Sequence, residues 1–384
     1  MMCEFDDPFI VLRTLLFINV SYKVTIFWSI FIIIFYTIEI CLEIYYMLTN
    51  FNINLLIRYG PITTFFLLMI VTAVLPVILG KEIFEVLAFQ CNTRWPLNMI
   101  RKDAQTRLKR KCQTINGCLL CILVILLSAL GVNIPYFGTQ RELLICVRVF
   151  EEYFGEWAFI PYYLYLAGFP FLYYHFLRIS FGFAYVFLEA QLQFFLIEEY
   201  LFETYQTDHE KHWKYLQDTR YQQQIGKSLR DCIAHHNDLT KLVKMSVNVT
   251  VTAMPIFLLI GIILYISSFA FIINFADTMT NILKIRVFLF LASTMSITIL
   301  FCWTGQQLIN VTSNIFFTLS GAPWYYWNLE NVKILLTFLT NCTKNESIVL
   351  AGIRLDYRMF VSMCRISFSY ALVLFKLRKR SLVY

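Results

Sequence analysis

The sequence predicts an all-α polytopic membrane protein with seven transmembrane helices, and three observations support this. First, 59% of the 384 residues are hydrophobic and only 15% are charged, whereas soluble domains have roughly 45–50% apolar and about 25% charged residues. Second, apolar residues form runs near the length of about 20 that crosses the hydrocarbon core as a helix. Third, these runs lack the alternation of membrane barrel strands. The composition therefore excludes a water-soluble fold, and the runs favour helices.

Six of the predicted spans are clear from apolar composition alone. The seventh is interrupted by Arg354, Asp356, Arg358 and Arg365, so hydropathy by itself assigns it only weakly. In chain order, the predicted spans are Val24–Leu48, Pro61–Gly80, Gly117–Gly138, Trp157–Leu188, Val249–Phe275, Val287–Trp303 and Ser347–Leu377.

The distribution of basic residues predicts a cytosolic N-terminus. Lys and Arg are roughly twice as frequent in the connections on the N-terminal side of the membrane as on the other side, and the more basic side is usually cytosolic. With seven crossings the C-terminus is then extracellular. A basic tail at residues 376–380 contradicts the rule locally and leaves open six or eight crossings. Glu4, Asp6 and Asp7 do not suit a cleavable signal peptide, so we expect the first span to serve as an uncleaved anchor.

Two long connections indicate helical structure outside the membrane. The segment Glu189–Asn248 continues the helical periodicity of the fourth span without a breaker. The segment Thr304–Lys344 is partly apolar but is punctuated by Gly305, Gly321 and Pro323. We therefore expect a cytosolic helical layer built from extensions of several spans.

No motif of a soluble enzyme is complete in this sequence. Residues 226–228 end like a phosphate-binding loop, but Tyr221 stands where that loop needs its first glycine. His209 and His212 are three residues apart, whereas the zinc-protease helix places its histidines four apart. The prediction is a protein that is not an enzyme, with no catalytic residues, no cofactor and no nucleic-acid partner.

Two further groups of residues could act as a metal site and as part of a cation pathway, and neither role is favoured. Cys232, His235 and His236 could share one helical face, but four metal ligands cannot be assembled there, so no metal site is predicted. Glu39 and Glu43 lie four apart on one face of the first span, in its outer half. Acidic groups in a membrane must face protein, water or the interface. Snorkelling to the interface is favoured here over a role in a cation pathway.

Several short motifs, taken together in their order, resemble the insect odorant receptor family. The resemblance covers residues 225–384 by motif and the whole chain by length, span number and orientation. The related gustatory receptors usually carry Thr-Tyr and then Gln-Phe at the end of their seventh span, which this chain lacks. The matching residues are Cys302-Trp303-Thr304-Gly305-Gln306-Gln307-Leu308, Trp327, Leu350-Ala351-Gly352, Ser367-Phe368-Ser369-Tyr370 and, upstream, Cys232-Ile233 with His236 before Leu239.

The resemblance implies a ligand-specific subunit of an odorant-gated, non-selective cation channel. Such a subunit forms a heterotetramer with the odorant receptor co-receptor, within membrane lipid, as a multi-pass protein of the plasma membrane in sensory neuron dendrites. Three parts are expected. Residues 1–188 form the first four spans with the ligand site, and residues 189–345 form the cytosolic anchor layer with spans five and six. Residues 346–384 form the pore-lining seventh helix and the tail. The first half of that split helix would be about Asn328–Lys344.

The pore helix carries the expected gate. Placed by its match at Tyr370, the family's hydrophobic constriction falls at Val373 and Leu377. An apolar ring closes a pore because water leaves a narrow apolar passage, so ions meet a desolvation barrier. Facing the pore also explains why this span is the most polar of the seven. The basic tail at residues 376–380 argues against strong cation attraction by this subunit.

The resemblance places the odorant pocket in the outer halves of spans two, three, four and six. Aromatic rings and Met there suit a small, apolar, volatile odorant. Such residues are also the ordinary filling of a membrane bundle, and a gustatory-type channel or, as a more distant alternative, a secondary transporter remains open. A transporter would show internal repeats, which are not evident. The expected pocket residues are Phe65, Phe66, Met69, Asn133, Tyr136, Phe137, Phe159, Tyr162, Tyr163 and Leu166, beside Tyr165 and Phe169.

Overall fold

The computed structural model describes residues 8–9, 12–13, 22–133, 144–205, 216–251, 253–343, 347–350 and 352–381. Within this part of the chain, seven helical stretches are long and apolar enough to cross a membrane, which confirms the predicted fold class and span number. These stretches correspond to α2 (Tyr22–Thr49), α3 (Ile53–Ile78), α5 (Lys102–Asn133), α7 (Phe159–Tyr205) with the residues from Ile145 onward, α9 (Met254–Phe275), α10 (Asn281–Ser320) and α12 (Tyr357–Ser381).

The remaining elements connect these helices. They are α4 (Gly80–Thr93), α6 (Ile145–Phe154), α8 (Thr219–Val251), α11 (Leu329–Cys342), the 3-10 turns η1 (Leu97–Met99), η3 (Gly155–Ala158) and η5 (Trp324–Tyr326), and the strands β1 (Val349–Leu350) and β2 (Ile353–Arg354). The helix α11 agrees with the first half of the split seventh helix expected at Asn328–Lys344. Asn328 caps it, because its side chain accepts a hydrogen bond from the Asn331 amide.

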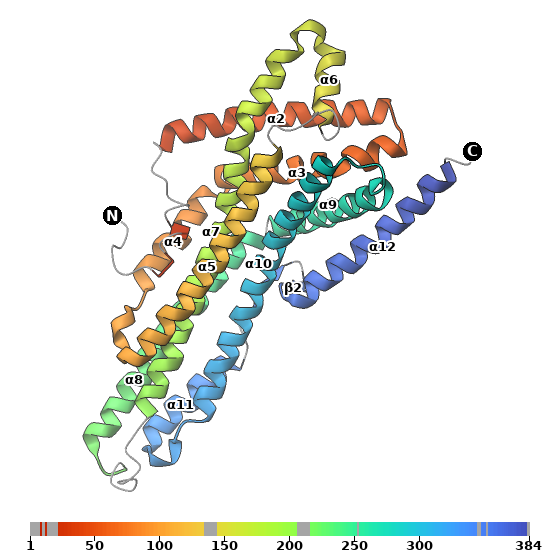
Figure 1. The fold of residues 1–384 in the computed structure, drawn as a ribbon. Helices are drawn as coiled ribbons and strands as arrows, with labels where there is room; N and C mark the ends of the chain where they lie inside the picture. Colours follow the sequence, from red (N-terminus) through yellow and green to blue (C-terminus); the bar gives the residue numbers. More distant parts are fainter. Residues whose placement is uncertain are drawn as a thin grey trace.

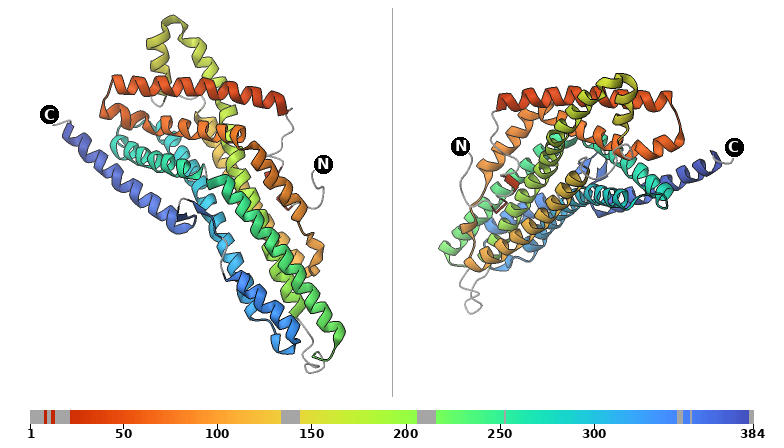
Figure 2. Two further views of the ribbon diagram at one scale, coloured as in Figure 1. Left: turned by 180° about the vertical axis from the view of Figure 1, so that it is seen from behind. Right: turned by 45° about the horizontal axis from the view of Figure 1, so that its top comes forward.

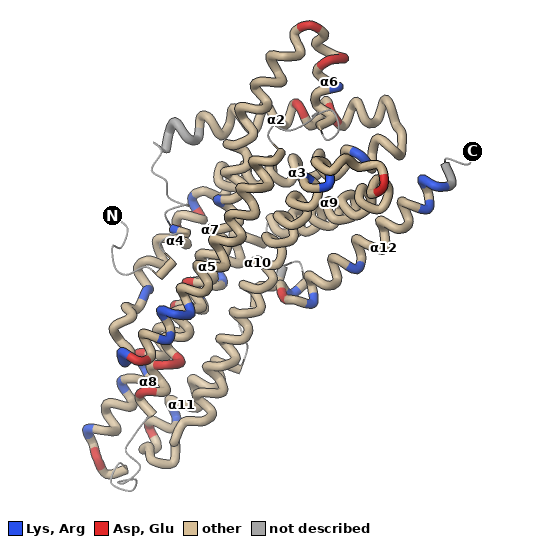
Figure 3. The backbone as a smooth tube through the Cα atoms, viewed as in Figure 1, with Lys and Arg blue, Asp and Glu red and all other residues tan. Residues whose placement is uncertain are grey.

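Two helices are much longer than a membrane crossing. The 47 residues of α7 and the 40 residues of α10 extend roughly 70 and 60 Å at 1.5 Å per residue, against a hydrocarbon core of about 30 Å. Figures 1 and 2 show their far ends packed beside α5, α8 and α11, away from α2 and α3. Charged residues gather along this far end and on α12, as Figure 3 shows. The predicted helical extensions are therefore present.

The buried apolar residues form two main clusters. One joins α2, α3, α5, α7 and α10 at the end where α2 and α3 cross the long helices. The other joins α7, α8, α10 and α11 in the extended bundle. Helix α7 runs without interruption through both clusters, so no helix end marks the predicted boundary between residues 188 and 189.

The seventh span begins later than predicted. Residues at the start of the predicted span Ser347–Leu377 instead form the antiparallel pair of β1 and β2, with Val349 opposite Arg354. Gly352 has a φ of 82°, a left-handed conformation that glycine adopts without steric cost. Asp356 then caps α12 by accepting a hydrogen bond from the Met359 amide at 2.9 Å. Two of the charged residues that interrupted the span thus lie before the helix.

Candidate functional site

The predicted pocket residues of α3 lie in a closely packed aromatic core. Phe65, Phe66 and Met69 are all buried. The ring of Phe66 lies 5.9 Å from that of Tyr36 and 5.3 Å from that of Tyr165, and the Tyr36 hydroxyl donates a hydrogen bond to the Tyr165 carbonyl at 2.5 Å. These three residues therefore fill the junction of α2, α3 and α7 in the conformation described here.

The predicted pocket residues of α7 divide between two sides of that helix. Tyr162 and Leu166 are half-buried against the aromatic core. Phe159 and Tyr163 are 53% and 66% exposed. They are four residues apart and share the outward face of the helix, so the two pairs do not converge on one space.

Asn133, one of the predicted pocket residues, lines a small cavity. This cavity has a volume of about 20 Å³ and lies where α3, α5, α9 and α10 meet, beside Phe290. It holds roughly one water molecule. The Asn133 amide donates a hydrogen bond to the Ala129 carbonyl at 2.7 Å. Tyr136 and Phe137 lie outside the described residues.

A much larger cavity lies elsewhere, between α3, α4, α7, α9, α10 and the beginning of α12. Its volume is about 860 Å³, within the range of small-molecule sites. Its lining is mostly apolar and includes Met359 and Met363 of α12, but none of the eight predicted pocket residues that the structure describes. Residues of α2, α8 and β2 also line it. Sequence reasoning missed this cavity because nine elements spread along the chain form it, and no local motif marks it.

Polar pairs stand on the wall of this large cavity. The Ser29 hydroxyl lies 3.0 Å from Nε2 of His175. The hydroxyls of Tyr265 and Thr298 lie 2.6 Å apart. Ser29, His175 and Tyr265 are buried. All three line the cavity together with Thr298. The cavity therefore combines apolar walls with a few hydroxyl groups that can orient a guest.

The helix α12 packs through one narrow stripe. Met363, Ser367 and Ala371 are buried, each four residues after the last, and this spacing places them on one face of a helix. Helix α12 lies along α9, as Figure 2 shows. The remainder of α12 is largely uncovered in the single chain.

The predicted pore residues lie on a second, exposed stripe of α12. Tyr370, Val373 and Leu377 are 58%, 49% and 47% exposed, and Ile366 continues the same line one turn earlier. Their spacing of four, three and four residues keeps them on one helix face. The structure thus brings the three predicted pore residues together, although it describes only one chain.

One residue of the basic tail turns towards the bundle. The Nε atom of Arg378 donates a hydrogen bond to Oδ1 of Asn54 at 2.5 Å, and its Nη1 atom donates to the Asn274 carbonyl at 2.9 Å. Its guanidinium also lies 4.7 Å from the ring centre of Phe275. Arg378 therefore joins α12 to α3 and α9.

The buried histidines of α8 each have a partner from another element. Trp95 stacks on His235 at 4.1 Å, and Nε2 of His235 lies 3.2 Å from Oε1 of Gln193. Nε2 of His236 lies 3.6 Å from the Cys342 sulfur. Burial, with a smaller effect from His236, lowers the pKa of His235 to about 3, and burial lowers the pKa of His236 to about 4. Both imidazoles are neutral near pH 7.

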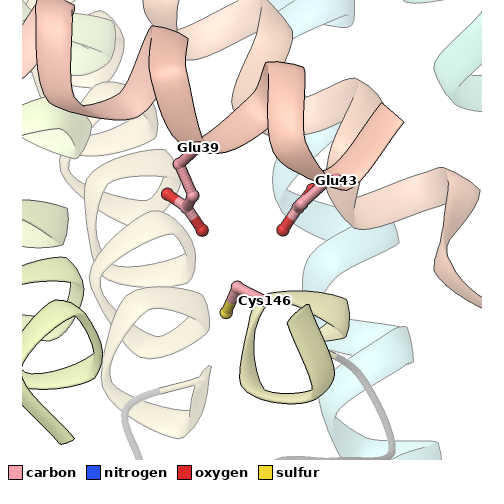
Figure 4. Close-up of side chains that lie close together, drawn as sticks. All are labelled: Glu39, Glu43 and Cys146. Atoms are coloured by element: carbon pink, nitrogen blue, oxygen red, sulfur yellow. The ribbon is translucent and has the colours of Figure 1, made fainter. Parts of the chain in front are cut away.

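The prediction that Glu39 and Glu43 snorkel to the membrane interface is wrong. Their exposed fractions are 3% and 4%. Both carboxyl groups point from α2 towards Cys146 of α6, as Figure 4 shows. The sequence could not show this, because Cys146 belongs to a helix far along the chain.

Comparisons with known proteins agree with this arrangement. The chain is similar in fold to the insect olfactory receptor OR5 from Machilis hrabei, solved in complex with eugenol, with a TM-score of 0.63 and 11% identity over 96% of this chain and 97% of that one. A second structure of the same receptor matches with a TM-score of 0.62, the same identity and the same coverage. No curated protein matches the chain. Residues 82–368 match the family model described as 7tm Odorant receptor, and the chain therefore belongs to the odorant receptor family.

Proposed function

We propose that this chain is the odorant-specific subunit of a ligand-gated, non-selective cation channel, and that it assembles with the odorant receptor co-receptor as a heterotetramer. The observation that carries the proposal is the division of α12 into a buried stripe and an exposed apolar stripe. Met363 and Ala371 attach the helix to α9, whereas Val373 and Leu377 remain uncovered. An uncovered apolar stripe on a largely free helix suits the wall of a pore formed between subunits.

The proposed topology has a cytosolic N-terminus and an extracellular C-terminus in the plasma membrane of a sensory neuron dendrite. The excess of Lys and Arg on the N-terminal side supports it. In this orientation the charged ends of α5, α7, α8, α10 and α11 lie in the cytosol. They would form the anchor layer at residues 189–345, between the ligand-binding part at 1–188 and the pore helix and tail at 346–384.

The proposed ligand is a small, apolar, volatile molecule. Burial of about 250 Å² of its surface at roughly 25 cal/mol/Å² contributes about 6 kcal/mol before entropic costs, which corresponds to micromolar binding at best. The related structure with eugenol supports a guest of this size. Opening requires that the ligand bind the open state more tightly than the closed state.

Two positions compete for the ligand. The outer position at Asn133 follows from the family resemblance, but its cavity of about 20 Å³ must widen by movement of rings such as Phe290. The large cavity already has about 860 Å³ and reaches Met363 of α12. We propose the outer position as the odorant site and keep the large cavity as its competitor. Both positions are lined by residues of α9 and α10, so a ligand at either one can shift these helices, and α12 packs against both of them.

Recordings from cells that express the chain with and without the co-receptor test the proposed function. We expect odorant-evoked cation current only with the co-receptor, and we expect it to persist when G-protein signalling is blocked. Current that depends strictly on G proteins would contradict the proposal. Asn133→Leu should shift the odorant concentration for half-maximal current if the outer site is correct. Leu258→Trp, which fills the large cavity, should shift it only if the ligand binds there instead.

A further inference from the structure

Three potential metal ligands meet in the interior of the chain, at the junction of α2 and α6. One carboxylate oxygen of Glu39, one of Glu43 and the Cys146 sulfur all lie within 4.8 Å of one another. We propose that these side chains bind a divalent cation of borderline softness, with Zn²⁺ as the best match. Glu39, Glu43 and Cys146 are not among the predicted pocket or pore residues.

The carboxyl groups lack partners that would stabilise their charge. Both side-chain oxygens of Glu39 are buried, and the polar side chain that lies within reach of them is the weak donor Cys146. Oε2 of Glu43 accepts one hydrogen bond from Thr63 at 3.1 Å. Neither carboxylate forms an ion pair with Lys or Arg in the part of the chain that the structure describes. Two adjacent buried carboxylates need a proton or a cation, because their charges repel and water is excluded.

The sulfur atom of Cys146 indicates which kind of metal ion the site would bind. Carboxylates alone suit Mg²⁺ or Ca²⁺, whereas a thiolate ligand favours softer ions, and Zn²⁺ binds both Cys sulfur and carboxylate oxygen. Cys146 is fully buried and comes from a different helix than the two acids. The Tyr165 hydroxyl lies next to the Cys146 thiol, within hydrogen-bonding reach of it. Polar groups from α6 and α7 thus meet the two carboxyl groups of α2.

The geometry is close to that of a metal site. Bond lengths of about 2.3 Å to sulfur and 2.0–2.2 Å to oxygen place the ligands of a tetrahedral zinc ion roughly 3.3–3.7 Å apart. The present limit of 4.8 Å needs a contraction of about 1 Å, which side-chain rotation can supply. Thr63 holds Glu43 in position, as an outer-shell residue does in many metal sites. Three protein ligands leave the fourth position open for water or Tyr165.

Binding of cobalt to the purified full-length chain tests the site. Co²⁺ replaces Zn²⁺ in tetrahedral sites, and a thiolate ligand gives it a near-ultraviolet charge-transfer band. We expect this band with one ion per chain and its removal by added Zn²⁺. The band should be absent from Cys146→Ser and retained by Cys41→Ser, whose exposed thiol lies on α2 beside the cluster. Glu39→Gln should weaken Co²⁺ binding at least tenfold, and Thr63→Ala about tenfold.

Three results, from the parent chain and from two different variants, would each overturn the proposal. A parent chain that binds no Co²⁺ would do so, and this outcome would indicate that Glu39 and Glu43 share a proton instead. A charge-transfer band that persists in a folded Cys146→Ser chain would place the ion at another thiol. Unchanged affinity in a folded Glu39→Gln chain would exclude the buried carboxylates as ligands.

Discussion

Gly305 of α10 lies directly against the backbone carbonyl oxygen of Leu355, the residue that leads into the cap of α12. A Cβ atom at position 305 would overlap that oxygen and would also crowd the Leu355 carbonyl carbon. The Leu355 amide is held in turn by the Ile348 carbonyl at 2.9 Å. The neighbouring Thr304 carbonyl accepts a hydrogen bond from Gln191 of α7 at 2.7 Å. One close contact therefore joins the long helices to the beginning of the proposed pore helix.

Substitution Gly305→Ala should separate α10 from the segment before α12. Backbone atoms cannot move aside as a flexible side chain can, so we expect a loss of about 1–3 kcal/mol in the free energy of unfolding. Thermal unfolding of the purified chain measures it. Gly117→Ala is the matched control, because nothing lies within 4 Å of a Cβ built there. Alanine at 117 should be neutral or slightly stabilising in the middle of a helix, and an equal loss at both positions would contradict the proposed contact.

The fold was largely predictable because membrane spans depend on local composition. All seven predicted spans correspond to helices, and α11 agrees with the expected Asn328–Lys344. The start of α12 was not predictable from hydropathy, since the hairpin before it depends on Gly352 and on the Asp356 cap. Local sequence shows that a segment can cross the membrane, but tertiary contacts decide where its helix begins.

The candidate site was less predictable for a physical reason. The predicted pore residues share a face because helical spacing alone fixes that relationship. The predicted pocket residues include Phe66, which is packed in the core, and Tyr163, which is mostly exposed. Whether an aromatic ring lines a cavity or fills it depends on the neighbouring helices. The burial of Glu39 depends likewise on α6, which no pattern within α2 reveals.

Loss of the Arg378 side chain should loosen the far end of α12. Arg378→Ala removes hydrogen bonds to Asn54 and Asn274, and hydrogen bonds of a charged group contribute about 1.5–3 kcal/mol in buried settings. Because Arg378 is half-buried, we expect a loss of about 1–2 kcal/mol in the free energy of unfolding. Lys379→Ala, at the exposed neighbouring position, is the control. Equal unfolding midpoints for the two variants would show that the hydrogen bonds of Arg378 do not stabilise the fold.

A buried amide network joins α8 to α11 and should be sensitive to one truncation. Nδ2 of Asn331 donates to the Gln222 carbonyl and to its Oε1 atom at 2.8 and 2.9 Å. Asn331→Ala leaves the backbone carbonyl of Gln222 with one bond fewer in a buried setting, which costs about 1–3 kcal/mol. Differential scanning fluorimetry measures this change. Lys333→Ala, two residues along α11, should change the free energy of unfolding by no more than about 0.5 kcal/mol.

Acid should destabilise the extended bundle through its histidines. The ordinary histidine pKa is about 6.5, whereas burial lowers that of His236 to about 4. Below pH 6.5 the unfolded chain therefore binds a proton that the folded chain does not, so the free energy of unfolding falls as the pH falls, until the folded pKa is reached. Between pH 6.5 and 5 the loss should be up to about 2 kcal/mol for this imidazole.

Unfolding of His236→Gln across this pH range measures the contribution of the imidazole. The glutamine side chain does not titrate, so the variant should lose stability less steeply than the parent between pH 6.5 and 5. Above pH 7.5 the two slopes should coincide, because neither the folded nor the unfolded imidazole then binds a proton. Parallel curves throughout would show that another group causes the acid sensitivity.

Truncation of the proposed gate should raise the current that flows without odorant. Val373 stands on the exposed stripe of α12 with Tyr370 and Leu377, and a smaller, less apolar constriction holds water more readily, which lowers the barrier to ions. We expect Val373→Ala to increase basal current severalfold in cells that also express the co-receptor. Phe375→Ala is the control, because residues two apart point to opposite sides of an α-helix and Phe375 is similarly exposed. Basal current that rises equally in both variants, or in neither, would remove Val373 from the gate.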